Sequence, residues 1–353
     1  MEKTLLKKRM RETPQMEPVD AVKLVYQSAF GCGHLLSENC ARRVAEELAR
    51  TPARGDVPVG APIGNRLCRL NLAAPAVQKL PPERIADMMR VTMARPLGGE
   101  AAMNAGLEAL RELARAGEAP FSPESLEAFL GGWDGHTPVS HSEAYRAAYA
   151  PAYRVVREDL GTLVPAVVRI ERKLAEGGRA LAVLDGPCGS GKSTLADALA
   201  ALYHTLPIRM DDFFLPPAMR TEQRLTQPGG NVHYERFREE VLAGLMRGGD
   251  VAYRRYDCQS GAWLDRVHRA APVTVIEGSY SHHPAFAEAY DALDALRIFV
   301  HTAEEERMER LRAREGERFF TFETRWIPLE KSYLEAYDIK SGADIALESQ
   351  PWA

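Results

Sequence analysis

The sequence predicts an α/β protein in which a parallel five-stranded sheet flanked by helices follows a mainly α-helical N-terminal domain. Two observations carry this prediction. Apolar residues recur at helical spacing through the first half of the chain, whereas from about Gly161 short apolar and β-branched runs alternate with longer helical stretches. The 353 residues suffice for about two domains. We therefore expect domains at 1–165 and 166–353, with the boundary between Tyr153 and Gly178.

The first domain is expected to consist of amphipathic helices, interrupted by a stretch rich in Pro and Gly over 51–64. Pro123 suits the first turn of a helix, where its missing N–H costs nothing. Ser142–Tyr153, together with Val155–Leu160, could form a further helix. The other helices are predicted from Val19, over Ser37–Leu48 with Ser37 as N-cap, and over Pro82–Ala94, Glu100–Ala116 and Ser122–Leu130.

Five short apolar runs in the second domain have the length and composition of buried strands. Helices can lie between them, which is the pattern of a parallel sheet. A helix over Val164–Glu176 leads into the first strand. The predicted strands are Leu181–Asp185, Leu206–Met210, Val273–Glu277, Leu296–His301 and Ala343–Leu347.

Composition and charge exclude several classes of protein. Hydrophobic residues make up 45% and charged residues 27%, which are ordinary values for a globular protein. The formal net charge of −4 provides no basic field for a nucleic acid, and no run of about 18 apolar residues suits a membrane. The five cysteines form no CxxC pair, and the N-terminus lacks the apolar core of a signal peptide. We expect a cytoplasmic protein with no nucleic-acid or membrane partner. The sequence leaves open whether the protein forms a homo-oligomer.

The strongest motif is GPCGSGKS at Gly186–Ser193, which satisfies the phosphate-binding pattern GxxxxGK[ST] directly after the first predicted strand. Glycines let backbone N–H groups surround phosphate oxygens at a helix N-terminus. Lys192 would reach the β- and γ-phosphates, and the Ser193 hydroxyl would bind Mg²⁺. The sequence thus predicts ATP and Mg²⁺ as cofactors, with ATP held by Gly186, Pro187, Cys188, Gly189, Ser190, Gly191, Lys192, Ser193 and Thr194.

Carboxylates end two of the predicted strands. A lone acid, Glu277, closes one strand and suits Mg²⁺ binding, directly or through water. This lone acid is unlike the Asp-Glu pair of AAA and helicase motors, and no NKxD motif indicates a GTPase. Asp211 and Asp212 follow the second strand, and alternation along an extended chain would direct one to the cleft. Asp211 is our candidate for orienting an acceptor hydroxyl; Asp212 could assist Mg²⁺ through water or bond to the backbone.

Taken together, these motifs resemble the uridine kinase branch of P-loop kinases, which includes nicotinamide riboside kinases, pantothenate kinases and phosphoribulokinases. The chain is most similar to bacterial proteins described as uridine kinase-like. The resemblance covers about half of the chain, from Gly178 to the C-terminus. It rests on the P-loop, MDDFFLP, PGGNVHYERF, YRRYDC and VIEGSY, with the EGSYS-HP and WIPLE segments at Glu277–Pro284 and Trp326–Glu330.

The resemblance implies a role for several residues. Asp211 takes the place of the catalytic base, Glu277 that of the magnesium-associated acid, and Tyr256 that of the aromatic residue near the nucleoside. His233 matches one nucleoside-contacting region, but no histidine lies near Tyr256, where Cys258, Gln259 and Trp263 stand instead. The residues expected to bind the acceptor are Asp212, Phe214, His233, Tyr256 and Arg318.

An arginine-rich stretch lies between the fourth and fifth strands. In kinases of this type such a segment is a lid that closes over ATP. Helix-surface ion pairing with neighbouring acids would explain most of these arginines equally well. Within the stretch we select Arg310, Arg314 and Arg318 as lid candidates, with Arg314 taken as catalytic.

The predicted function is ATP-dependent phosphorylation of a small-molecule hydroxyl, first of all that of a nucleoside such as uridine or cytidine. A different acceptor, such as nicotinamide riboside, pantothenate or a phosphosugar, is an alternative, and so is an ATP-gated sensor without catalysis. No role is predicted for the first domain. There, His34, His136 and His141 could share a metal or phosphate site or serve only loop structure, and Asn65, Arg66 and Arg69 could hold an anion.

Overall fold

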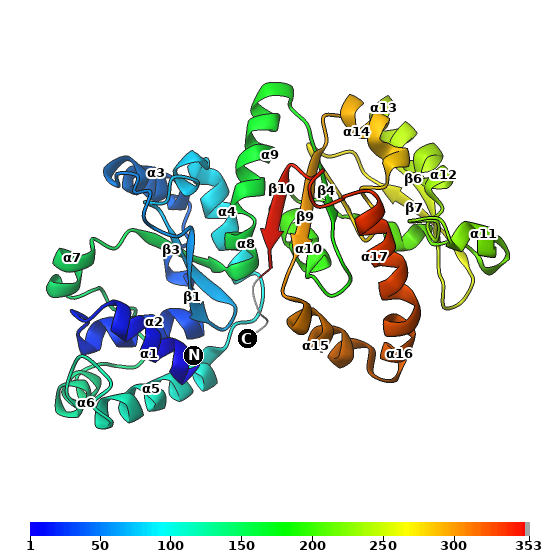
Figure 1. The fold of residues 1–353 in the computed structure, drawn as a ribbon. Coiled ribbons are helices and arrows are strands. Elements are labelled where there is room, and N and C mark those ends of the chain that lie inside the picture. The colour runs from blue at the N-terminus through cyan, green and yellow to red at the C-terminus, as the bar shows by residue number, and fades with distance from the viewer. Residues whose placement is uncertain (350–353) are drawn as a thin grey trace. The chain divides into compact units, whose positions relative to one another are not determined.

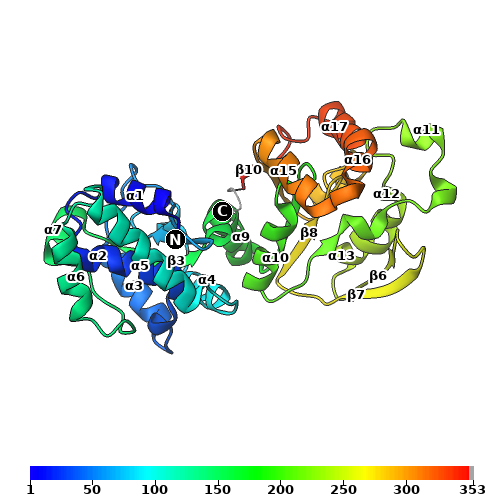
Figure 2. The same ribbon diagram turned by 90° about the horizontal axis from the view of Figure 1, so that it is seen from below.

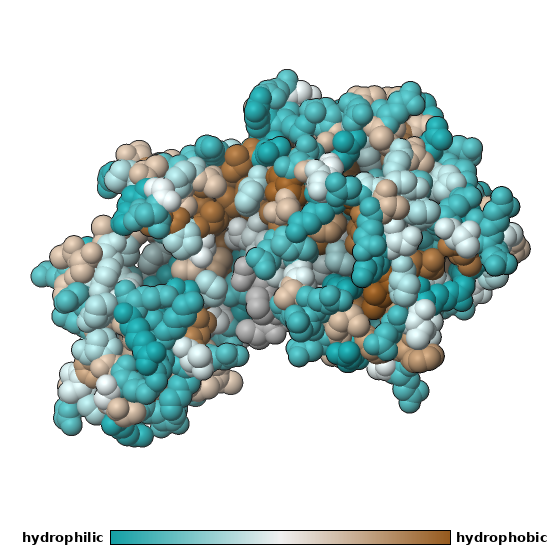
Figure 3. Space-filling view, viewed as in Figure 1, coloured by the Kyte–Doolittle hydropathy of each residue, from teal (hydrophilic) through white to brown (hydrophobic). Residues whose placement is uncertain are grey.

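The computed structural model describes residues 1–349. The described chain divides into two compact units, one formed by Met1–Val164 and the other by residues 165–349 (Figure 1). Within residues 1–349, none of the helices combines the length and apolar character needed to cross a bilayer. Hydrophilic residues predominate on the face of the molecule in Figure 3, with smaller hydrophobic areas between them.

The first unit is mainly helical. Side chains of Ser122 and Ser142 accept hydrogen bonds from the backbone at the starts of two helices, and Glu17 and Asp20 form a reciprocal cap at another. The helices are α1 (Lys3–Glu12), α2 (Pro18–Phe30), α3 (Cys40–Arg50), α4 (Pro82–Met93), α5 (Gly99–Arg115), α6 (Pro123–Gly131), α7 (Glu143–Tyr149) and α8 (Glu158–Thr162), with short 3-10 turns η1 (Gly33–Leu35) and η2 (Val77–Lys79).

A three-stranded antiparallel sheet, which the sequence analysis did not predict, completes this unit. It consists of β1 (Gly60–Gly64), β2 (Leu67–Asn71) and β3 (Tyr153–Arg157) in that order. The predicted helix over Val155–Leu160 is therefore wrong in its first half, because the β-branched Val155 and Val156 pair with β2. Ser37 is not an N-cap either, since α3 begins after Asn39 and has no side-chain cap.

The second unit contains the predicted parallel sheet of five strands. The strand order is β10-β9-β4-β8-β5, and every neighbouring pair is parallel. The predicted strand 206–210 shrinks to two residues, because the chain turns at Met210 into a short 3-10 helix, η3 (Met210–Phe213). The strands are β4 (Ala180–Asp185), β5 (Ile208–Arg209), β8 (Val273–Glu277), β9 (Leu296–His301) and β10 (Ile345–Glu348).

Helices and one antiparallel hairpin surround this sheet. The hairpin, β6 (Val251–Tyr256) and β7 (Trp263–His268), was not predicted and lies beside α12 and α13 in both ribbon views (Figures 1 and 2). The helical segments are α9 (Val164–Gly177), α10 (Lys192–Leu202), η4 (Pro217–Met219), α11 (Glu222–Leu225), α12 (Tyr234–Arg236), η5 (Phe237–Leu242), α13 (Ala243–Arg247), η6 (Pro284–Phe286), α14 (Ala287–Ala292), α15 (Glu304–Glu315), η7 (Gly316–Arg318), α16 (Phe319–Thr321), η8 (Phe322–Trp326) and α17 (Ile327–Ala336).

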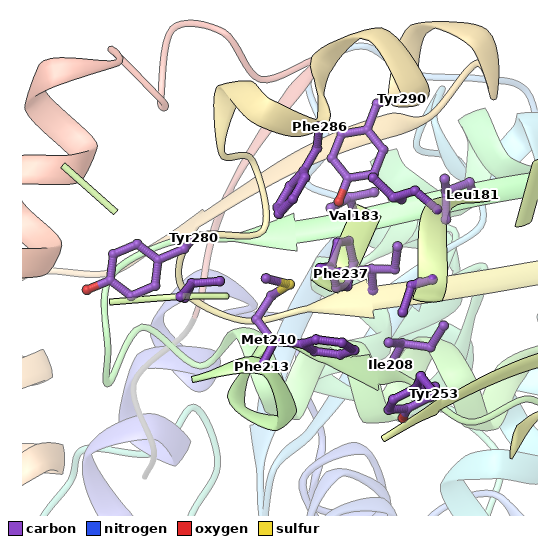
Figure 4. Packing of buried hydrophobic residues seen from close by; sticks show 14 of the residues in the cluster. Leu181, Val183, Ile208, Met210, Phe213, Phe237, Tyr253, Tyr280, Phe286 and Tyr290 are labelled. Atoms are coloured by element: carbon purple, nitrogen blue, oxygen red, sulfur yellow. The ribbon is translucent and has the colours of Figure 1, made fainter. Parts of the chain in front are cut away.

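A hydrophobic cluster of the second unit packs against the sheet and supports the carboxyl ends of its strands. Val183 of β4 and Ile208 of β5 pack there with the aromatic rings of Phe213, Phe237 and Phe286 (Figure 4). Phe213 meets Phe237 edge to face, with 5.0 Å between ring centroids. Phe213 directly follows the acid pair, so burial of its ring holds the acids at the sheet edge.

Candidate phosphate-transfer site

The glycine-rich loop connects the end of β4 to the first turn of α10, as its sequence predicted. Gly186 has φ of 148°, and a Cβ atom there would lie 2.0 Å from the carbonyl oxygen of Val300. Gly189 and Gly191 also have positive φ, of 79° and 89°. Only glycine satisfies both requirements at Gly186, the backbone conformation and the close approach.

Lys192 at the start of α10 has the environment of a phosphate ligand. It is only 8% exposed, and its Nζ makes one long hydrogen bond of 3.4 Å, to the carbonyl oxygen of Pro187. No carboxylate lies within 4.0 Å of this ammonium in the described part of the chain. A buried ammonium group with so few partners is costly unless an anion compensates it. The loop and Lys192 therefore fit a nucleotide phosphate.

Ser193 and Glu277 meet next to Lys192. The Ser193 hydroxyl donates to Glu277 Oε2 at 3.0 Å, and Arg209 Nη1 lies 2.5 Å from Glu277 Oε1. Burial raises the pKa of Glu277, while the positive charges of Lys192 and Arg209 oppose that change. A hydroxyl and a carboxylate are hard oxygen donors of the kind that Mg²⁺ prefers. The pair has the chemistry of ligands that would hold a magnesium ion.

The two aspartates of the predicted acid pair have different surroundings. Asp211 is exposed, and its charge acts on Glu277, whose pKa it raises. Asp212 is buried: its Oδ2 accepts a 3.2 Å hydrogen bond from the Tyr253 hydroxyl, and its Oδ1 lies 3.4 Å from Arg255 Nε. The expected alternation of an extended chain was wrong, since both residues belong to η3. The 3-10 turn nevertheless leaves Asp211 open to solvent and turns Asp212 toward the hairpin.

The arginine-rich stretch forms α15, η7, α16 and η8, and its arginines have different surroundings. Arg310 Nη1 donates to the carbonyl oxygen of Gly189 at 3.4 Å and to the Ser349 hydroxyl at 3.1 Å. Arg314 and Arg318 are exposed and pair with Glu315. Among the three lid candidates, the structure thus brings Arg310 to the loop and keeps Arg314 and Arg318 on the helix surface.

Three of the residues expected to bind an acceptor contact neighbouring parts of the chain, whereas Arg318 lies on the helix surface. Phe214 forms an isolated antiparallel bridge with Val232, and His233 accepts a backbone hydrogen bond from Arg236 at the start of α12. Tyr256 is 5% exposed and packs against the Trp263 ring at 5.0 Å between centroids. These contacts give the three residues structural partners within the second unit.

Three residues at the loop were not selected from the sequence. The carboxylate of Asp185 accepts hydrogen bonds from the backbone N–H of Gly186 at 2.6 Å and from the Tyr333 hydroxyl at 2.7 Å. Arg307 of α15 donates to the carbonyl oxygen of Cys188 at 3.3 Å, and Glu330 of α17 accepts from the N–H of Cys188. Of these three residues, Asp185 is the one that the sequence could have indicated, because it stands directly before the motif.

The histidines of the first unit do not form one site. His141 Nδ1 lies 2.6 Å from Asp20, and His141 Nε2 lies 2.6 Å from the Tyr153 hydroxyl. His34 packs against Tyr26, and His136 bonds through its backbone to Asp134. Within residues 1–349, no group of three or more His, Cys, Asp or Glu side chains is placed to hold a metal ion.

The suggested anion ligands of this unit have partners or structural roles of their own. Asn65 donates to the backbone carbonyl of Ser28 at 2.9 Å, and Arg69 is buried, with its Nε 3.0 Å from Gln27 Oε1. Asn65 and Arg66 both have positive φ, which is the backbone geometry of the tight turn that joins β1 to β2.

No protein-family model matches the chain, and no curated protein matches it significantly. Solved structures similar to this one include a possible uridine kinase from Bacillus stearothermophilus, with 17% sequence identity and a TM-score of 0.38. That similarity covers 51% of this chain and 97% of the other. A candidate fructose transport system kinase from a Silicibacter species has 23% identity and a TM-score of 0.34, covering 48% of this chain and 89% of the other. Each of these two similarities, to a structure described as a kinase, covers about half of this chain.

Proposed function

We propose that this protein is an ATP- and Mg²⁺-dependent kinase that phosphorylates the hydroxyl of a small molecule. The observation that carries the proposal is the grouping of Lys192, the Ser193–Glu277 pair and the exposed Asp211 at one edge of the sheet. A protein that only binds ATP needs the first three residues. Transfer of a phosphoryl group to an alcohol requires, in addition, an exposed carboxylate close to the magnesium ligands.

In the proposed reaction, the glycine-rich loop and Lys192 would hold the phosphates of ATP, and Ser193 and Glu277 would hold Mg²⁺. The metal ion would offset negative charge on the β- and γ-phosphate oxygens. Asp211 orients the acceptor hydroxyl toward the γ-phosphorus and accepts its proton as the new O–P bond forms, while the bond from the γ-phosphorus to the β,γ-bridging oxygen breaks and ADP leaves. Arginines of α15 bring positive charge to the transferring group, and both Arg307 and Arg310 contact the loop in this structure.

We propose a nucleoside, uridine or cytidine, as the first acceptor to test, because the motifs at Asp211, His233 and Tyr256 resemble those of uridine kinases. Nicotinamide riboside, pantothenate and phosphosugars are the next candidates. The five cysteines are unpaired thiols, compatible with the reducing cytoplasm in which we place the enzyme.

The deciding experiment measures ADP release from ATP with each acceptor of this panel, together with mass spectrometry of the product. We expect one acceptor class to accelerate ADP release and to gain a phosphoryl group. The Lys192→Ala variant should abolish this activity. ATP hydrolysis that no acceptor accelerates would favour the ATP-gated sensor over the kinase.

A further inference from the structure

The backbone of Cys188, in the middle of the glycine-rich loop, is held from two sides by the arginine-rich segment. Both carboxylate oxygens of Glu330, at 2.9 and 2.8 Å, face the N–H of Cys188. On the other side, Arg307 Nη1 donates to the carbonyl oxygen of the same residue at 3.3 Å. Arg307 belongs to α15 at the start of the segment and Glu330 to α17 just after its end, so one loop residue is bound by the chain at both limits of the segment.

The contact made by Glu330 is specific because its carboxylate is buried. Glu330 is 4% exposed, and besides the N–H of Cys188 it accepts a short hydrogen bond from the hydroxyl of Ser279. No Lys, Arg or His within residues 1–349 lies close enough to Glu330 to form an ion pair. Neutral donors therefore stabilise this buried charge, and each accounts for a large share of that stabilisation.

Ser279 connects the same carboxylate to the magnesium side of the site. It stands two residues after Glu277, and its hydroxyl also lies 3.3 Å from the carbonyl oxygen of Gly186. Glu330 thus touches the glycine-rich loop and the chain that leaves β8. These are the two backbone segments that flank the proposed phosphate site.

The chain between Arg307 and Glu330 leaves the sheet region through α15 and α16 and returns along α17, coloured orange to red in Figure 1. Arg312, Arg314 and Arg318 lie on it and are exposed. Such a segment needs fixed ends to hold guanidinium groups at a reproducible distance from the phosphates, and misplacement of about 1 Å costs about 100-fold in rate.

We propose that Glu330 is a positioning residue for phosphoryl transfer, which orients the Cys188 amide and holds the arginine-rich segment 307–326 in place over the phosphate loop. The proposal rests on the proposed kinase function. It assigns Glu330 no contact with the reacting atoms. Glu330 acts through two hydrogen bonds. The loss of activity in a variant should therefore depend on whether those bonds can still form, more than on whether the side chain is charged.

Two substitutions at Glu330 separate geometry from charge. Glu330→Gln keeps an oxygen for the Cys188 N–H, and its amide group can donate to the Ser279 hydroxyl, which in turn can donate to the carbonyl of Gly186. Glu330→Ala removes both hydrogen bonds. Glu335→Gln is the matched control, because Glu335 lies on the same helix, is exposed and has only a 3.8 Å ion pair with Lys331.

The experiment combines steady-state kinetics with hydrogen–deuterium exchange of the full chain. For Glu330→Ala we expect kcat to fall about 100-fold, with the KM for ATP changed by less than about threefold, and faster exchange in 307–326 and at the Cys188 amide. Glu330→Gln should lower kcat about fivefold, which corresponds to the loss of one hydrogen bond. Glu335→Gln should match the wild type in both measurements.

Unchanged exchange of segment 307–326 in Glu330→Ala would overturn the proposal, as would equal losses in the Gln and Ala variants, which would assign the effect to charge. If Glu330→Ala does not fold, Ser279→Ala removes one of the two bonds and should accelerate exchange of the same segment to a smaller degree. The exchange measurement needs no acceptor, so it tests Glu330 even if the panel shows that the protein is not a kinase.

Discussion

The Ser193 hydroxyl donates a 3.0 Å hydrogen bond to Glu277 Oε2, and this bond joins the first turn of α10 to the end of β8. The two residues are 84 positions apart in the chain. They meet because β4 and β8 are parallel neighbours with Leu184 opposite Glu277, so the loop after β4 and the last residue of β8 lie at one edge.

This pair leads to a prediction about magnesium. Glu277→Gln should raise the Mg²⁺ concentration for half-maximal activity about 10- to 100-fold, because an amide is a poorer magnesium ligand or partner than a carboxylate. The measurement is activity against Mg²⁺ at saturating ATP. Glu288→Gln, on the exposed surface of α14, is the control. If the Mg²⁺ requirement of Glu277→Gln is unchanged, Glu277 does not belong to the metal site.

Asp211 and Asp212 should differ in what their loss affects. Asp211→Asn is expected to lower turnover about 100- to 10,000-fold and to leave the affinity for ATP unchanged, since it removes the proton acceptor. Asp212→Asn should mainly lower the thermal midpoint, because it weakens the contacts to Tyr253 and Arg255 that hold the hairpin. Near-normal turnover of Asp211→Asn on the true acceptor would rule out its role as base.

Gly186 provides a test of the loop backbone. Gly186→Ala should destabilise the second unit by more than about 4 kcal/mol, because the new Cβ would meet the Val300 carbonyl at 2.0 Å. Gly249→Ala has a positive φ of 91° but nothing within 4 Å of its Cβ, so it should cost about 1 kcal/mol. Chemical denaturation of both variants measures the difference. Equal losses would mean that backbone conformation alone requires glycine at position 186.

The stability of the first unit should depend on pH because of the carboxyl group of Glu158. Burial raises the pKa of this carboxyl to about 7, with Arg66 opposing. Because the pKa is higher in the folded protein, its stabilising contribution is complete below about pH 4.5 and is lost as the pH rises through about 7. Glu158→Gln should therefore raise the thermal midpoint relative to the wild type at pH 8 and have little effect at pH 4.5. Equal effects at both pH values would contradict the prediction.

The sheet and its phosphate loop could be predicted from the sequence because their signals are local. Apolar runs predicted Val273–Glu277 and Leu296–His301 with the observed bounds. The motif at Gly186–Ser193 carries its own requirements for glycine, lysine and a hydroxyl. Segments with weaker local signals were missed, as at Val155, where β-branched residues next to a helical pattern form an edge strand only because β2 is there to pair with them.

The sequence by itself determined which residues have the chemistry expected of phosphate and magnesium ligands, since residue type and spacing carry that signal. Only the tertiary structure decided which arginines reach the loop, which aspartate stays open to solvent and that Glu330 holds the Cys188 amide. Glu330 and Cys188 are 142 positions apart, and no periodicity relates them. Their contact depends on where α17 returns to the sheet, and that follows from packing of the whole unit.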